Sequence, residues 1–307
     1  MQVNINAYSP RESIEIVGRA GVRKGNMRLD KMFMSSVSAG MILAFACATL
    51  LSTNASQWYQ ENATGLIRTI AALVFPYGLT IIVLTGADLC TGSFMFTTVS
   101  VLQRRLSPVK MVVHWFVTFF GNLAGSLFIV AIITGYGGIF DSAYYHTEAI
   151  KFAVAKQNTP EWHEIFLRAI GANWLVCLAC YLGHSGHDYA SKVAGIWFPT
   201  FAFVSLGLDH VVANMFFVPM GIWQGAPIPI GRYIGKGIVP GFLGNLVGGG
   251  LFVGAFYWYL HLVGEGPVVV DGRVRFETSS PKKQRYRMHR RHSQPNGPVC
   301  LSLHEGR

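Results

Sequence analysis

The stretch GLDHVVAN, residues 207–214, decides the architecture, because it places Asp209 and His210 between two apolar runs long enough to lie in a bilayer. Ionisable groups at that depth mark functional sites by default. A second Gly-x-Asp step, within GADLCTGS at residues 86–93, interrupts an earlier apolar run in the same way. Matched interruptions in the two halves of a membrane protein indicate a transport site.

The composition indicates a polytopic membrane protein. The chain has 307 residues, of which 51% are hydrophobic and only 13% are charged, whereas an ordinary soluble domain is about 25% charged. The net charge of +10 comes from basic residues at the two ends and in the short loop 103–110. That placement follows the positive-inside rule. We therefore expect a lipid bilayer and no nucleic acid as partner, in a plasma-membrane protein with both termini cytosolic.

Hydropathy predicts an all-α protein with six transmembrane helices, of which the second and fifth are broken. A helix broken at membrane depth is tolerated only where its backbone lines a cavity or is packed in protein. The expected spans cover residues 32–52, 67–101 with a break at 86–92, 111–134, 166–183, 193–223 with a break at 207–214, and 238–263.

The domain organisation follows from these spans. We expect a cytosolic lead-in over residues 1–30, amphipathic and at the membrane surface, then a transport domain over 31–264 and a basic cytosolic tail over 265–307. Residues 135–165 are expected to form the longest internal loop. Metal-binding and disulfide patterns are not indicated, since the five cysteines are scattered, four of them in apolar segments, and the His-rich connector 184–188 is typical of a solvated turn.

An internal repeat relates the two halves. GNLAG at residues 121–125 matches GNLVG at 244–248, and these motifs follow the two breaks by similar distances. The repeats are expected over 31–134 and 166–264. Each contains three crossings, an odd number, so the second copy must be inverted relative to the first, which brings the broken helices together near the midplane. Aligning the breaks sets Leu89 opposite His210.

Comparison of the two copies distinguishes the expected role of the aspartates from that of the histidine. Aspartate occurs at both breaks, as Asp88 and Asp209, and is therefore expected to be architectural, accepting backbone amide hydrogens beside Gly86 and Gly207. Histidine occurs only at the second break, which makes His210 the chemical candidate. The alternative for His210 taken alone is a satisfied interface histidine.

Three separated segments resemble the signature segments of the formate/nitrite transporter family, in the family's order. They are GADLCTG at 86–92, NWLVCLA at 173–179 and DHVVANMF at 209–216, the last followed by PMG at 219–221. The resemblance covers residues 30–263. The extended basic tail, together with sequons in the loop 53–66, looks most similar to the fungal nitrite transporters.

The resemblance implies an aquaporin-like protomer in a homopentamer, each protomer carrying its own pore for small monovalent anions. Nitrite is the expected permeant, crossing with the help of protonation near a central histidine, and formate or a related short monocarboxylate is the alternative. No enzymatic activity or cofactor is expected. A membrane-bound haem or metal oxidoreductase is the competing class, and its candidate ligands are His114, His163, His184, His187 and His210.

The family pattern also implies roles for individual positions. His210, Thr91 and Asn173 correspond to positions that line the pore. Apolar constrictions correspond to Leu79 with Leu89 and to Phe75 with Phe203, and basic vestibule residues correspond to Lys31 on the cytosolic side and Lys156 outside. For Thr91 a helix cap, and for the constriction residues core packing, are the alternative interpretations.

Overall fold

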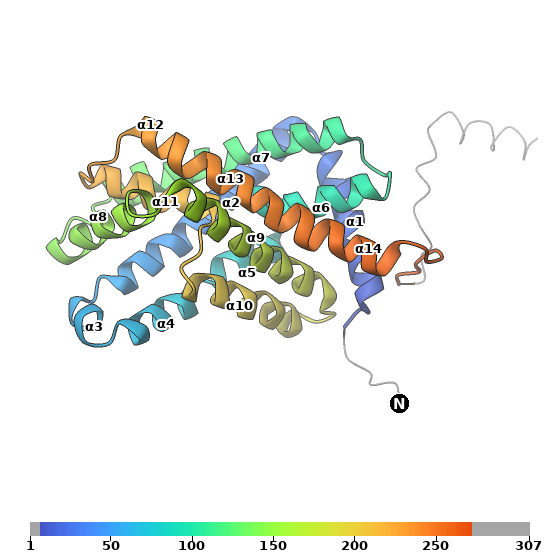
Figure 1. Cartoon of the computed structure of the whole chain (residues 1–307), viewed down its shortest axis with the longest axis horizontal. Helices are drawn as coiled ribbons and strands as arrows, with labels where there is room; N and C mark the ends of the chain where they lie inside the picture. Colours follow the sequence, from blue (N-terminus) through green and yellow to red (C-terminus); the bar gives the residue numbers. More distant parts are fainter. Residues whose placement is uncertain (1–6, 272–307) are drawn as a thin grey trace, which may run out of the picture.

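The computed structural model describes residues 7–271, and within that range it is a bundle of tilted helices (Figure 1). Most of the predicted basic tail, from residue 272 onward, lies outside the described residues. Five helical segments in the described range are long and apolar enough to span a membrane: α2 (Leu29–Asn54), α4–α5 (Thr64–Thr85), α7–η1 (Pro108–Tyr136), α9 (Trp162–Ser185) and α12–α14 (Ile230–Leu262).

The fifth span completes the set of six, and both it and the second span are broken. The second span ends with α5 (Tyr77–Thr85) and resumes as the half-helix α6 (Cys90–Leu102). The fifth is α10 (Tyr189–Ser205) followed by the half-helix α11 (Val211–Trp223). The predicted six spans with breaks in the second and fifth are therefore confirmed. The last span is irregular, with π-helical stretches η2 (Tyr233–Ile238) and η3 (Val247–Ala255) flanking α13 (Val239–Leu246).

Each break begins at a glycine in the left-handed conformation. Gly86 follows α5 with φ +77° and Gly207 follows α10 with φ +68°. Glycine adopts this conformation without the steric cost that a Cβ atom imposes, and it is the usual residue just beyond a helix end. The Gly-x-Asp steps thus end one helix and redirect the chain before the next.

Asparagine side chains hold the breaks together, one from each copy of the repeat. Asn122 accepts the amide hydrogen of Cys90 at 2.8 Å and donates to the carbonyls of Ser36 and Asp88. Asn245 accepts from Val211 at 2.8 Å and donates to the carbonyls of Ala169 and Asp209. The Gly-Asn-Leu repeat therefore encodes a clamp that satisfies backbone groups at each break.

The aspartates are expected to accept backbone amide hydrogens at the breaks, and the structure gives them a different role. Asp88 accepts from the side chains of Lys24, Ser93 and His114, at 3.0, 2.6 and 2.9 Å. In the hydrogen bonds that the described residues make, its carboxylate receives no backbone amide at the break. The aspartates are architectural here because they hold neighbouring side chains, while the asparagines satisfy the backbone.

The second aspartate repeats this arrangement. Asp209 Oδ1 accepts from Lys156 Nζ at 3.2 Å and from Asn214 Nδ2, also at 3.2 Å. Asn214 follows Asp209 by five residues, as Ser93 follows Asp88 in the first copy. The two breaks are therefore built by corresponding residues, which supports duplication.

Two further helices extend the repeat beyond the predicted crossings. α1 (Pro10–Gly25) begins with a capping box of Ser9 and Glu12 and packs against α6 and α9, with Ile14 and Val17 fully buried. The lead-in is thus part of the folded body rather than a helix lying on the surface. The expected loop 135–165 instead contains α8 (Ala143–Gln157), which packs against α11 as α1 packs against α6.

Replacement of Asn245 by alanine should destabilise the protein. It would leave the Val211 amide and two carbonyls without partners, at about 1–3 kcal/mol for each buried group. The thermal unfolding midpoint of Asn245→Ala in detergent should fall below that of Asn62→Ala, a control at an exposed position on α3 (Gln57–Asn62). Equal midpoints for the two variants would contradict the clamp.

Candidate functional site

Two hollows approach the breaks from opposite ends. The first, the α8-side vestibule, has a volume of about 500 Å³. The second, the α1-side vestibule, has a volume of about 330 Å³. The α8-side vestibule reaches Phe75, Phe203 and His210, and the α1-side vestibule reaches Leu79 and Leu89. The breaks therefore separate two cavities, as expected of a pathway interrupted at its centre.

Buried apolar side chains line each vestibule beside the breaks. Phe75 and Phe203 meet edge to face with ring centroids 5.6 Å apart, and both are buried. Leu79 and Leu89 are buried at the inner end of the opposite vestibule. Of the four predicted constriction residues, Phe75 and Phe203 thus line the α8-side vestibule, and Leu79 and Leu89 line the α1-side vestibule.

Thr91 and His210 meet where the two half-helices begin. Thr91 Oγ1 lies 2.8 Å from His210 Nε2, and both residues are buried. Thr91 is in the first turn of α6 and His210 precedes the first residue of α11, so the contact joins the two half-helices. Alignment of the two breaks sets His210 opposite Leu89, and the structure places each of these immediately before a half-helix.

Backbone geometry selects the protonation pattern of His210. Its Nδ1 accepts the amide hydrogen of Ala213 at 3.1 Å, so this nitrogen carries no proton. We therefore assign the neutral tautomer with hydrogen on Nε2, which donates to Thr91 Oγ1. The Thr91 hydroxyl keeps its own hydrogen and can donate it, in a position that is buried between the two half-helices.

Asn173 supports Thr91 rather than lining a vestibule. Its Nδ2 donates to the Thr91 carbonyl at 3.1 Å and to the Asn245 carbonyl at 2.6 Å, and its side chain is fully buried. Cys177 also points its thiol at the Thr91 carbonyl, at 3.5 Å. These contacts fix the start of α6, and Asn173, like Thr91, lines neither vestibule.

A lysine reaches each break from a short helix outside the six spans. Lys156 on α8 pairs with Asp209, and Lys24 on α1 pairs with Asp88 at 3.0 Å. Lys24 also lines the α1-side vestibule. Lys31, which the resemblance placed there, is exposed on α2 and lines neither vestibule. The correction follows from α1, whose packing brings the earlier lysine to the break.

The candidate haem or metal ligands lie apart from one another. His114 bonds to Asp88, His184 Nδ1 donates to the Cys180 carbonyl at 2.8 Å, and His187 packs against Tyr8. Within residues 7–271, three or more His, Cys, Asp or Glu side chains are nowhere grouped as a metal site would need. These three histidines each have a structural partner of their own.

The chain matches a known protein family over most of its length. The sequence profile of a family described as Formate/nitrite transporter matches residues 11–259. The chain belongs to the formate/nitrite transporter family. The match takes in both breaks, both asparagine clamps and the Thr91–His210 contact, as well as nearly all of α1 and the whole of α8. The pathway described above therefore lies within the part of the chain that the family profile matches.

Relatives of this formate/nitrite transporter agree along nearly their full length. A "Probable formate transporter" of Methanothermobacter thermautotrophicus is 32% identical over 267 residues, covering 83% of this chain and 97% of the relative. The "Uncharacterized transporter YrhG" of Bacillus subtilis is 35% identical over 249 residues, covering 81% and 92%.

A solved structure, "Pentameric formate channel with formate bound", matches with a TM-score of 0.67 and 28% identity, covering 76% of this chain and 98% of that one. The relatives and the structural neighbour are transporters and channels. The chain is accordingly a membrane transport protein and not an enzyme, and the oxidoreductase alternative is set aside.

Lys24→Met and Lys31→Met should differ in their effect on transport. Loss of Lys24 leaves the buried carboxylate of Asp88 without its cation, a change that costs about 3–5 kcal/mol when a buried pair is broken. We expect a lower unfolding midpoint and a marked loss of anion uptake for Lys24→Met, measured in proteoliposomes. Lys31→Met should keep the unfolding midpoint and the anion uptake of the wild type. A loss of uptake in Lys31→Met comparable to that in Lys24→Met would contradict the assignment of Lys24 as the vestibule lysine.

Proposed function

We propose that each protomer conducts small weak-acid monoanions through the two vestibules, past Thr91 and His210. The observation that carries the proposal is the Thr91–His210 contact at 2.8 Å, which joins the two half-helices. The apolar side chains of Phe75 and Phe203 in one vestibule, and of Leu79 and Leu89 in the other, support a path that is apolar on either side of this contact. Between the apolar side chains of the two vestibules, the polar partners that such a path offers an anion are Thr91 and His210. Passage therefore depends on how the charge of the anion is neutralised or stabilised at the apolar side chains.

Protonation of the permeant is the proposed solution. A bare anion entering an apolar constriction loses its hydration, which is far more costly than for the neutral acid. The falling dielectric raises the pKa of a carboxylic acid, so a weak acid takes up a proton as it approaches the constriction. The Thr91 hydroxyl, polarised by the Nε2–H of His210, then hydrogen-bonds the permeant midway. Neutral His210 does not trap an anion as a fixed cation would.

Formate is the proposed principal permeant, with nitrite as the competitor. The names of the relatives favour formate, whereas the resemblance to fungal nitrite transporters puts nitrite first. Both are small, bent monoanions of weak acids, so the mechanism above serves either. The structural neighbour is a pentameric formate channel, which supports the proposal of a homopentamer.

The proposed sidedness places the α8-side vestibule outside and both termini in the cytosol of a plasma-membrane protein. Its support is the basic loop at residues 103–110, which lies between α6 and α7, and the basic residues of α1.

Proteoliposomes with an inward proton gradient test the function. Wild-type protein should take up labelled formate above the level of empty vesicles, and His210→Ala should lose most of that uptake while keeping its oligomer on size exclusion. Thr91→Val, which removes only the hydroxyl, should also be impaired, whereas Thr91→Ser should retain uptake. The mechanism fails if Thr91→Val transports as well as Thr91→Ser.

Competition separates the two substrates. Unlabelled formate and unlabelled nitrite are added in turn to wild-type vesicles taking up labelled formate, at two external pH values. We expect formate to compete at the lower concentration and uptake to be faster at the more acidic pH, because a larger fraction of the permeant is protonated. Stronger competition by nitrite would reverse the substrate assignment.

A further inference from the structure

The lysine at the α8-side break is already fully occupied. An ammonium group has three N–H donors, and Lys156 Nζ donates to the carbonyls of Gly207 and Leu208, at 2.8 and 3.0 Å, as well as to Asp209. A permeant anion could be bound by Lys156 only if one of these bonds broke. Lys156 therefore supplies positive potential and holds the break, but it has no donor to spare.

Two other cations of the same vestibule have partners elsewhere. Lys151 Nζ donates to Gln60 at 2.6 Å, and Arg168 pairs with Glu164 at 3.6 Å. The fourth cation in the vestibule wall is Arg68. Its guanidinium makes no hydrogen bond or ion pair with the part of the chain that the structure describes, so its N–H groups are available to a ligand.

Arg68 stands directly on the approach to the apolar constriction. It lies on α4 at the spacing i, i+3, i+7 with Ala71 and Phe75, and all three line the vestibule, so they share one face of the helix. Two helical turns, about 10 Å, separate Arg68 from Phe75 along the axis. An anion held by the guanidinium would thus be positioned outside the Phe75–Phe203 pair.

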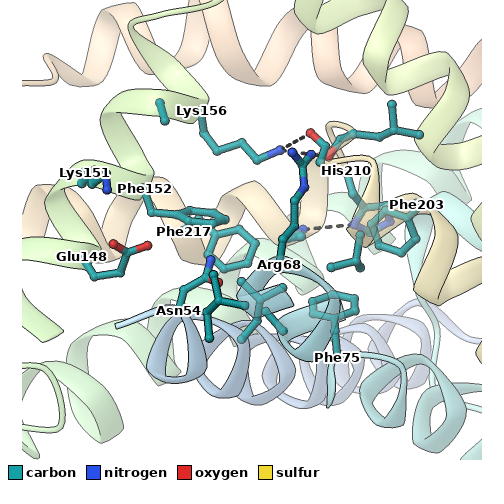
Figure 2. Close-up of a pocket in the computed structure, with 18 of the residues that line it drawn as sticks. Asn54, Arg68, Phe75, Glu148, Lys151, Phe152, Lys156, Phe203, His210 and Phe217 are labelled. Carbon is teal, nitrogen blue, oxygen red and sulfur yellow. Dashed lines mark hydrogen bonds between the residues drawn. The ribbon is translucent and has the colours of Figure 1, made fainter. Parts of the chain in front are cut away.

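The break itself makes room for the guanidinium. Figure 2 shows Arg68 and Lys156 reaching from opposite walls of the vestibule toward the same segment beside His210. Nη2 of Arg68 lies against Gly207, where a methyl group would clash with it. The glycine therefore serves both the left-handed turn and the close approach of a charged side chain to the start of the break.

We propose that Arg68 is the docking residue for the permeant at the α8-side mouth, and that its planar fork favours anions with two oxygens on one atom. This inference rests on the proposed function. A guanidinium presents two parallel N–H groups that match a carboxylate, and the bent O–N–O frame of nitrite offers the same pair of acceptors. A spherical halide cannot use both donors in this way. Arg68 is a positioning residue, since it acts before the permeant reaches Thr91.

The acidic residue that shares this vestibule with Arg68 does not neutralise it. Glu148 on α8 lines the same wall, is buried, and accepts from Gln60 Nε2 at 2.7 Å. Burial is the main reason that the pKa of the Glu148 carboxyl is raised above its usual value, against smaller opposing effects of Gln60 and Lys151. A raised pKa weakens its repulsion of anions under acidic conditions.

Concentration dependence of formate uptake in proteoliposomes tests the docking role. Arg68→Gln should raise the formate KM by about tenfold, the loss expected for a bidentate charged hydrogen bond, while the maximal rate is retained. Arg68→Lys keeps the charge but loses the fork, so its KM for formate should stay well above that of wild type. Chloride, added as a competitor, should inhibit Arg68→Lys more strongly relative to formate than it inhibits wild type.

The matched control is Arg168→Gln, which removes a charge from the same vestibule wall. Because Arg168 is exposed and paired, its loss should change the formate KM by less than about twofold. The inference is overturned if wild-type vesicles transport formate and the Arg68→Gln saturation curve superimposes on theirs. It is also overturned if Arg168→Gln raises KM as much as Arg68→Gln, because the effect would then be one of general charge. Absence of wild-type uptake would instead refute the proposed function.

Discussion

Two helices end in the middle of the membrane, and the amide and carbonyl groups they expose there must find partners inside the protein. Asn122 and Asn245 supply those partners, each with one acceptor and two donor bonds to the chain around its break. The rest of the site depends on this clamp. With the backbone satisfied, the side chain at the start of each half-helix is free to face the pathway, and those side chains are Leu89 and His210.

The chemistry arises where the two copies of the repeat differ. Both breaks carry an aspartate held by a lysine from a helix outside the six spans, with Lys24 on one side and Lys156 on the other. Only the second break carries a histidine immediately before its half-helix, and the threonine that faces this histidine comes from the first copy. The aspartate–lysine pairs are thus common to both copies of the repeat. The Thr91–His210 contact, which provides the polar centre, is asymmetric.

Much of this could be predicted because it depends on periodicity and on repeated motifs. The charge-free runs predict six spans, and the two Gly-x-Asp steps predict both breaks. The asparagine clamp is visible as a repeated Gly-Asn-Leu motif, but its bonds link residues far apart in the chain, such as Asn122 to Ser36 and Asn245 to Ala169, a separation that local patterns do not bridge. The role of the asparagines follows from contacts that form only in the folded chain.

There are physical reasons why other features could not be predicted from the sequence. α8 mixes aromatic, small and charged residues, and buries Glu148 and Gln157, so its sequence has the composition of a loop. The choice between Lys31 and Lys24 depends on the packing of α1, which brings Lys24 to Asp88 and which its sequence does not reveal. Arg68 carries no motif at all. Its significance comes from the absence of a partner among the described residues and from its position above Phe75.

The central claim is that the permeant passes between the breaks, within the protomer, and contacts Thr91. An experimental structure of the assembled protein at saturating formate tests this most directly. We predict an anion between the Phe75–Phe203 and Leu79–Leu89 pairs, within hydrogen-bonding distance of Thr91 Oγ1. A structure with formate bound only along an axis between protomers, and with the space at Thr91 filled by protein side chains, would contradict it.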